Sequence, residues 1–271
     1  QIRRMEKAGC EVVRLAVPDR EAVEALAEIK KRVRVPLVAD IHFDYRLALA
    51  SLKKGVDALR INPGTIGSAD KVKEIVLAAK EQEVPIRIGV NSGSLEKNLL
   101  RKYGSATPEA MVESAWGHIE RFEDLGFSLI KVSMKAPDII RTIRAYRLLA
   151  EKVDYPFHAG ITEAGSLVPG SVKSSAGLAL LLSEGLADTI RVSLTAPPEE
   201  EVRVGYLILQ SLGLRSRGPD IISCPTCGRC EVDMLRILKE VEKRLASLKD
   251  NINVAIMGCM VNGPGEAKEA D

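Results

Sequence analysis

Four of the five cysteines lie close together near the end of the chain, at spacings that could hold a metal centre. Cys224, Cys227 and Cys230 form a C-x₂-C-x₂-C run, and Cys259 follows shortly afterwards. This spacing is typical of iron–sulfur ligation, and taken alone it predicts a site made of all four thiolates. A zinc ribbon would use a second C-x₂-C element, but Cys259 has no cysteine or histidine two residues away, which favours iron–sulfur chemistry.

The composition and the thiol grouping also indicate the setting of the protein. Four clustered cysteines, with Cys10 alone far from them in the sequence, suit a metal site in a reducing compartment better than disulfides. The formal net charge is only +2, which does not favour a nucleic-acid partner. No apolar stretch approaches the roughly 20 residues that span a bilayer. We expect a cytoplasmic protein, with a plastid as the alternative because the chain begins at Gln1 inside a helical pattern and reads as a fragment.

A second set of candidate residues is basic and recurs in successive β-type segments. Arg14, Arg60, Lys131 and Arg191 each follow a glycine at a nearly fixed offset. Equivalent positions on alternate strands of a (β/α)₈ barrel share one layer of its interior, so these side chains should point inward. Unpaired buried cations are costly, so an anion, most naturally phosphate, should meet them.

Strand alternation predicts the polar neighbours of these cations on the same inward faces. The expected inward neighbours are Ala16, Asp40, His42, Asn62, Arg87, Asn91, Ser133, Lys135, His158, Thr162, Ser193 and Thr195. Acids such as Asp40 could neutralise the cations in a purely structural network. The inward acids are fewer than the inward bases, so the set favours ligand binding.

Two further residues can be assigned from their places relative to the strands. Glu163 follows Thr162 at the end of a strand, where barrel enzymes carry catalytic side chains, so we expect it to act as a general acid. His118 lies on a helix far from any strand end, and we expect it to be a surface or packing residue.

The elements that must position these residues alternate between β-type segments and helices. The seven β-type segments are residues 11–18, 36–43, 58–63, 85–91, 129–134, 157–162 and 189–194. Asp19 is a candidate N-cap, and Pro108 and Pro137 stand near helix starts. The alternation predicts an α/β fold, a (β/α)₈ TIM-type barrel whose first strand would precede Gln1. A doubly wound open sheet is the structural alternative.

The pattern changes after the barrel segments. Residues 220–223 lead into the cysteines, followed by a long charged helix over 231–248 and a strand-like piece over 253–257. We therefore expect a barrel domain over residues 1–217 and a partial α+β cluster domain over residues 218–271.

Six motifs give the chain a resemblance to a known family. They are Val38-Ala-Asp-Ile-His42, Arg60-Ile-Asn-Pro-Gly64, Gly89-Val-Asn-Ser-Gly93, Thr162-Glu-Ala-Gly165, Cys224-Pro-Thr-Cys227 and Gly258-Cys259-Met-Val-Asn-Gly-Pro-Gly-Glu266. On these motifs the sequence resembles the IspG/GcpE family, the 4-hydroxy-3-methylbut-2-en-1-yl diphosphate synthases of isoprenoid biosynthesis. The resemblance covers essentially the whole chain.

The resemblance implies a [4Fe–4S] cluster held by three cysteines and one glutamate. By motif match these ligands are Cys224, Cys227, Cys259 and Glu266, so Cys230 is not a ligand, in contrast to the bare spacing. A carboxylate is a harder and more labile ligand than a thiolate, so the iron bound by Glu266 could open to take a substrate oxygen.

The reaction that the resemblance implies is the two-electron reductive ring opening and dehydration of 2-C-methyl-D-erythritol 2,4-cyclodiphosphate. Ferredoxin or flavodoxin would supply the electrons, and a head-to-tail homodimer is implied. Glu163 and Glu266 would be catalytic. The substrate-binding set would be Arg14, Asp40, His42, Arg60, Asn62, Arg87, Asn91, Lys131, Ser133, Thr162, Arg191 and Ser193.

Two other functions remain as alternatives at this point. A dihydropteroate-synthase-like barrel acting in methyl transfer would bind an anion at its strand ends, but it gives the cysteines no role. A non-catalytic iron–sulfur electron carrier would use the cysteines, but it leaves the inward cations unexplained.

Overall fold

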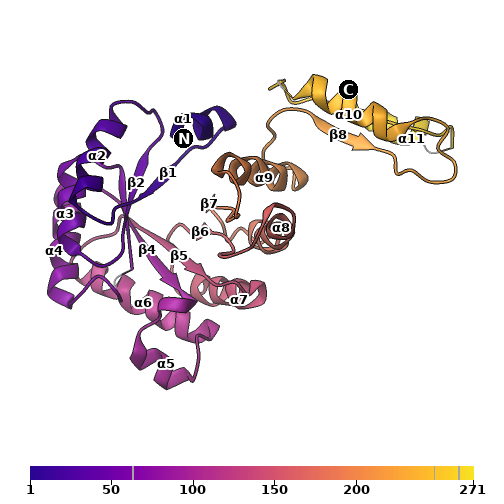
Figure 1. Ribbon diagram of the computed structural model, residues 1–271. Coiled ribbons are helices and arrows are strands. Elements are labelled where there is room, and N and C mark those ends of the chain that lie inside the picture. Colours follow the sequence, from indigo (N-terminus) through magenta and orange to yellow (C-terminus); the bar gives the residue numbers. More distant parts are fainter. Residues whose placement is uncertain (63, 247, 262) are drawn as a thin grey trace. The chain divides into compact units, whose positions relative to one another are not determined.

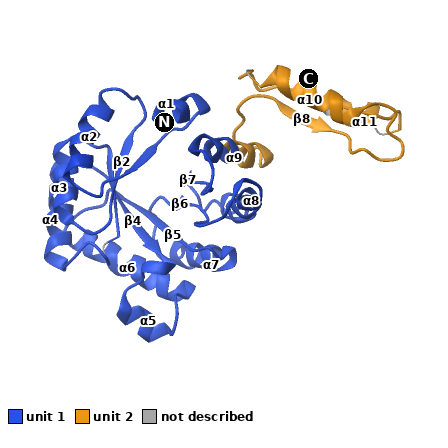
Figure 2. Ribbon diagram, viewed as in Figure 1, with its two compact units in different colours: residues 1–205 blue, residues 206–271 orange. Residues whose placement is uncertain are grey.

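The chain forms two compact units in a computed structural model that describes residues 1–62, 64–246, 248–261 and 263–271. The first unit contains residues 1–205 and the second contains residues 206–271 (Figure 2). Pro63 of a predicted strand, Ser247 of a predicted helix and Asn262 of the second cysteine motif lie outside the described residues.

The strands of the first unit follow one another around a barrel in sequence order (Figure 1). The parallel five-stranded sheet contains β1 (Val13–Ala16), β2 (Leu37–Ile41), β3 (Ala58–Ile61), β4 (Ile86–Asn91) and β5 (Ile130–Lys135). A parallel pair follows, β6 (His158–Ala159) and β7 (Thr189–Ile190), and a bridge between Val132 and Phe157 continues the series from β5. A doubly wound sheet would reverse its strand order, so the predicted TIM-type barrel is confirmed.

Helices cover the outside of these strands (Figure 1). They are α1 (Ile2–Ala8), α2 (Arg20–Lys30), α3 (Tyr45–Lys53), α4 (Ala69–Glu81), α6 (Pro108–Asp124), α7 (Ile139–Ala150), α8 (Leu167–Ser183) and α9 (Pro198–Ser211). A 3₁₀ turn η1 (Ser92–Ser94) and helix α5 (Lys97–Tyr103) follow β4, and α5 packs on α6. The predicted N-cap Asp19 is confirmed, because its side chain accepts the N–H of Ala22 at 2.8 Å. None of the helices in the described part of the chain is long and apolar enough to cross a bilayer.

The alternation along each strand separates an apolar layer from a polar one. Leu37, Ile41, Leu59, Ile61 and Ile88 are fully buried on the faces that meet the helices. The residues between them carry the polar side chains to the barrel interior. The apolar layer therefore holds the strands together and leaves the interior available for chemistry.

The second unit begins within α9 and contains a short parallel strand pair (Figure 2). Strands β8 (Asp220–Ser223) and β9 (Asn253–Ile256) pair in parallel. Helices α10 (Met234–Leu245) and α11 (Gly263–Glu266) and a 3₁₀ turn, η2 (Ala267–Glu269), complete it. Helix α10 is shorter than the predicted span of 231–248. The expected boundary at residues 217 and 218 falls between α9 and β8.

Candidate active site

A polar cavity of about 140 Å³ lies in the barrel interior, at the carboxyl ends of its strands. The residues that line it are Arg14, Asp40, His42, Arg60, Arg87, Asn91, Ser133, Lys135, Thr162 and Arg191. All but Lys135 belong to the predicted substrate-binding set. Strand register brings them together, because Asp40 pairs with Arg60, Arg60 with Arg87, and Asn91 with Lys135.

Asp40 is the one carboxylate among the described residues that line this cavity. Its carboxylate pairs with Arg60 Nη1 at 3.0 Å and with Arg14 Nη1 at 3.2 Å, and His42 Nε2 lies 3.7 Å away. Asp40 and Arg60 are almost fully buried. Asp40 and its basic partners thus form the ion-pair network considered above, but a single carboxylate pairs with more than one cation.

Arg87 and Lys135 contribute charges that Asp40 does not pair with directly. Burial, followed by repulsion from Arg14 and Arg60, lowers the pKa of Arg87 to about 9. Its Nε atom is buried and meets no hydrogen-bond partner within the described residues. Burial and then repulsion from Arg87 and Arg191 lower the pKa of Lys135 well below its ordinary value. Both charged forms are disfavoured by their surroundings, and a bound polyanion would favour them.

His158 lies in the same interior, as strand alternation predicts. Its Nδ1 atom is 2.9 Å from Thr189 Oγ1. Burial, followed by repulsion from Lys135 and Arg87, lowers the pKa of His158 well below its ordinary value. The ring is therefore neutral at a working pH near 7 and adds no charge to the cavity.

A glycine makes room for the Arg60 guanidinium. A Cβ atom on Gly89 would lie 2.4 Å from Arg60 Nε and 2.7 Å from Arg60 Nη2. Gly89 lies on the inward face of β4, as Arg87 and Asn91 do, so a side chain at position 89 would fill the space that the Arg60 side chain occupies. This packing explains the glycine of the Gly89–Gly93 motif physically.

Charge counting within the described lining supports an anionic ligand. The lining includes five basic side chains, Arg14, Arg60, Arg87, Lys135 and Arg191, and one carboxylate, Asp40. Arg191 has a further partner in Glu201 on α9, at 3.6 Å. Even with that pair, the bases outnumber the acids at the cavity.

Lys135 is the cavity residue that the predicted set omits. The offset from a glycine singles out Lys131 on the same strand, which is half-buried and is not among the lining residues. In the register, Lys131 pairs with Arg87, whereas Lys135 pairs with Asn91, four residues closer to the strand ends. Strand alternation predicts that both lysines face inward, and register with the neighbouring strand is what selects Lys135 for the cavity.

Three other predicted residues are not among those described as lining the cavity. Asn62 is buried after β3 and donates from Nδ2 to Ser94 Oγ at 3.0 Å. Ser193 is half-buried just after β7. Glu163 follows Thr162, which lines the cavity, and its own side chain is exposed. Its φ of 52° lies in the left-handed region, which is costly for a residue with a side chain.

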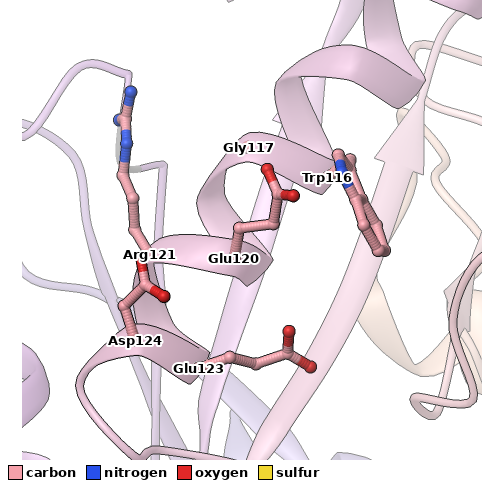
Figure 3. A pocket seen from close by; sticks show the side chains of 6 residues that line it. All are labelled: Trp116, Gly117, Glu120, Arg121, Glu123 and Asp124. Atoms are coloured by element: carbon pink, nitrogen blue, oxygen red, sulfur yellow. The ribbon is translucent and has the colours of Figure 1, made fainter.

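A shallow hollow on the outer side of α6 offers a contrasting environment. Trp116, Glu120, Arg121, Glu123 and Asp124 line it together with Gly117, as Figure 3 shows. Its acids outnumber its base, so it would repel a polyanion. The barrel cavity is therefore the better candidate for a diphosphate ligand.

The cysteine-bearing loops of the second unit follow its paired strands. Strand β8 ends at Ser223, directly before Cys224, and β9 ends at Ile256, shortly before Cys259. Ser223 and Ile256 are register partners, so both loops leave the same edge of the sheet. Cys259 is also near enough to Cys227 to affect the pKa of that thiol.

The thiol donors therefore fit an iron–sulfur cluster in chemistry and in backbone placement. The loops lie at one edge of the sheet, but their described side chains do not converge on a single point. Within the described residues, no group of three or more His, Cys, Asp or Glu side chains could hold a metal ion. Glu266 ends α11 and is exposed.

Two family models divide the chain between them. The GcpE TIM-barrel domain matches residues 1–206, and the GcpE protein C-terminal domain matches residues 220–271. This chain belongs to the GcpE family. Its membership agrees with the motifs in both units, which include the cysteine runs and the cavity residues.

Relatives within the GcpE family are similar over the whole chain. A protein of Geobacter sulfurreducens is 58% identical over 271 residues, which are 77% of its own length. One of Maridesulfovibrio salexigens is 61% identical over the same span, 76% of its length. Both are named 4-hydroxy-3-methylbut-2-en-1-yl diphosphate synthase (flavodoxin).

Solved structures of other enzymes share the barrel of this GcpE chain. A Yersinia pestis dihydropteroate synthase, in complex with a sulfonamide drug, superposes with a TM-score of 0.55 and is 14% identical, covering 79% of this chain and 84% of its own. A Xanthomonas albilineans dihydropteroate synthase gives 0.51 at 12% identity, covering 78% and 82%. At such low identity this likeness shows the fold alone.

Proposed function

We propose that this chain catalyses the two-electron reductive ring opening and dehydration of 2-C-methyl-D-erythritol 2,4-cyclodiphosphate. The product is 4-hydroxy-3-methylbut-2-enyl diphosphate of the methylerythritol phosphate pathway. The observation that carries the proposal is the excess of basic over acidic side chains in the described lining of the barrel cavity. The names of the GcpE relatives agree with it.

The cavity residues have distinct tasks in this proposal. Arg87 and Lys135 bind the diphosphate, because a polyanion favours the charged forms that their surroundings disfavour. Asp40 holds the guanidinium groups of Arg14 and Arg60 in place, so that they need no reorganisation when substrate binds. Asn91 and Thr162 supply uncharged polar groups to the rest of the substrate.

The second unit supplies the electron-transfer chemistry. Cys224, Cys227, Cys259 and Glu266 would hold a [4Fe–4S] cluster, which delivers electrons singly when bound. Reduced flavodoxin is the proposed donor, because the relatives carry it in their names, and ferredoxin is the alternative. We propose a homodimer as the working assembly.

The alternative functions explain less of the structure. The likeness to dihydropteroate synthases is one of fold, and a methyl-transfer barrel leaves the cysteine loops without a role. A non-catalytic electron carrier leaves the basic cavity without a role. The comparisons with GcpE relatives do not favour either one.

Replacing Arg87 with methionine should test the proposal at the cavity. We expect the dissociation constant for the cyclodiphosphate to rise by about 10- to 100-fold, because a charge-assisted contact contributes roughly 1.5–3 kcal/mol. The midpoint of thermal unfolding should stay the same or rise, because Arg87 faces like charges. Calorimetric titration of the anaerobically purified, full-length protein without reductant measures the first quantity, and scanning calorimetry the second.

A matched control is Arg147→Met, which removes an exposed guanidinium that pairs with Glu184 between α7 and α8. It should leave the dissociation constant unchanged. Unchanged affinity in Arg87→Met together with lower thermal stability would show that the cations form a structural network. Failure of the unmodified protein to bind or convert the cyclodiphosphate would refute the proposed reaction.

A further inference from the structure

A buried polar cluster ties the loop after β4 to helix α6, outside the cavity. Glu96 lies directly before α5, and its Oε1 atom is 2.7 Å from His118 Nε2 and 3.1 Å from Ser114 Oγ. Ser114 and His118 both come from α6 and are buried. The expectation of a surface or packing role for His118 is thus resolved: its side chain is 5% exposed and pairs with a carboxylate.

The electrostatics of the cluster fix the direction of its hydrogen bonds. Burial alone would raise the pKa of Glu96, but hydrogen bonds from His118, from its own backbone and from Ser114 outweigh it and lower the pKa to about 2. The ionised carboxylate can only accept, so Nε2 of His118 donates. Glu96 therefore carries a negative charge at any working pH near neutrality.

Stability alone does not account for this pair. Glu96 Oε2 and His118 Nδ1 are buried and have no hydrogen-bond partner within the described residues. A largely buried carboxylate whose hydrogen-bonded pair leaves polar atoms unsatisfied contributes little to folding, and apolar residues of similar volume often replace such a pair without loss. The pair should therefore have a role in placing the segments that it joins.

Those segments lead to the cavity. A Cβ atom on Gly64 would lie only 2.8 Å from Glu96 Oε1, so the loop after β3 packs directly on the carboxylate. The N–H of Gly64 donates to Asn62 Oδ1 at 3.1 Å, and Asn62 Nδ2 donates to Ser94 Oγ at 3.0 Å. The Glu96 carboxylate thus contacts the loop after β3 and belongs to the segment after β4, which directly follows Asn91 of the cavity lining.

We propose that Glu96 and His118 are positioning residues that hold the loops after β3 and β4, so that Asn62 and Asn91 are placed for the cyclodiphosphate. Neither residue lines the cavity, so both act through the loops. The inference rests on the proposed function and adds to it a pair of residues that determines substrate affinity from outside the site.

The double variant Glu96→Leu/His118→Leu tests this role. We expect the dissociation constant and KM for the cyclodiphosphate to rise about tenfold or more, since small misplacements of binding groups are costly. At saturating substrate, kcat should change by less than about threefold, because uniform binding is what is lost. The thermal midpoint should stay equal or rise. Glu96→Gln, which keeps the volume and an accepting oxygen, should restore the affinity to within about threefold of the unmodified protein.

Glu113→Leu is the matched control on the same helix. Its carboxylate also joins α6 to α5, accepting from Lys102 Nζ and Tyr103 Oη at 2.6 Å each, but these partners stand in the last turn of α5, away from the loops. Affinity and KM should not change in this variant. A rise as large as in the double variant would show that any loosening of α5 against α6 suffices, and would overturn the specific role of the pair.

Gly64→Ala provides an independent route to the same answer if the double variant does not fold. Its Cβ would press on Glu96 and shift the loop after β3 without removing a charge, so the dissociation constant should rise there too. Binding by the unmodified protein tests the proposed function itself. Normal binding there, with unchanged affinity in both the folded double variant and Gly64→Ala, would overturn the positioning role and leave the proposed function intact.

Discussion

Serine substitution of Cys224, Cys227 or Cys259 should each abolish the iron–sulfur cluster, whereas Cys230→Ser should keep it. A serine hydroxyl is a poor ligand to iron compared with a thiolate, so losing one of three thiolates should remove most of the bound iron and essentially all turnover. Iron and sulfide analysis of anaerobically purified full-length variants, with their visible spectra, measures the outcome.

Cys227 and Cys230 have different hydrogen-bond contacts. Hydrogen bonds from the backbone and then the side chain of Arg229 lower the pKa of Cys227, which favours the thiolate that a metal needs. The Cys230 thiol donates to the carbonyl oxygen of Val232 at 3.3 Å, and its Sγ would lie 2.6 Å from a Cβ on Gly258. The Cys230 thiol thus has contacts with Val232 and Gly258 that need no metal. Cys230→Ser serves as the matched control.

Two outcomes would contradict this ligand set. A full complement of iron in Cys227→Ser would remove that thiol from the site. Loss of the cluster in Cys230→Ser, with the fold intact by circular dichroism, would instead support the four-cysteine site that the bare spacing predicts.

The barrel could be predicted because its strands and helices have local signals. Gly9, Gly55, Gly126 and Gly185 all adopt the positive φ values of helix ends, and the strands that follow begin within a few residues. Alternation then assigned the inward faces of Arg60 and its neighbours correctly. These features depend on residues close in sequence, which is why one sequence was enough.

The features that escaped prediction depend on contacts between distant segments. Alternation predicts that Lys135 points inward, but its place in the cavity lining depends on its register with Asn91, which an offset from a glycine cannot report. The pair of Glu96 with His118 joins residues 22 positions apart on different elements. Glu96 directly precedes a helix and His118 lies in the middle of another, so neither position in the sequence indicates a buried partner.

Glu163→Gln should lower turnover by roughly 10²–10⁴-fold, the usual cost of losing a general acid. Glu163 directly follows Thr162 of the cavity lining, at the strand end where barrel enzymes carry catalytic groups. Its φ of 52° is a conformation that a non-glycine residue adopts at a cost of about 1–3 kcal/mol. Glutamine keeps the shape and the hydrogen-bonding capacity but removes the proton that Glu163 would donate to the departing ring oxygen in the proposed role. The rate should be measured with a chemical reductant, so that docking of the donor protein plays no part.

Glu83→Gln is the matched control for this substitution. Glu83 is also an exposed glutamate with a positive φ, 54°, but it lies between α4 and β4, where the strand enters the barrel and not where it leaves. Because the control changes the same residue type in the same backbone conformation, any general effect of the substitution would appear in both variants. Turnover, affinity and iron content should be normal in Glu83→Gln, while Glu163→Gln keeps its cluster and its affinity and loses turnover.

The competing explanation is that Glu163 pairs with an inward cation, which predicts weaker binding or lower stability with kcat nearly intact. Near-normal turnover in Glu163→Gln would remove this carboxyl from the mechanism, and the acid would then have to be sought among the groups that line the cavity.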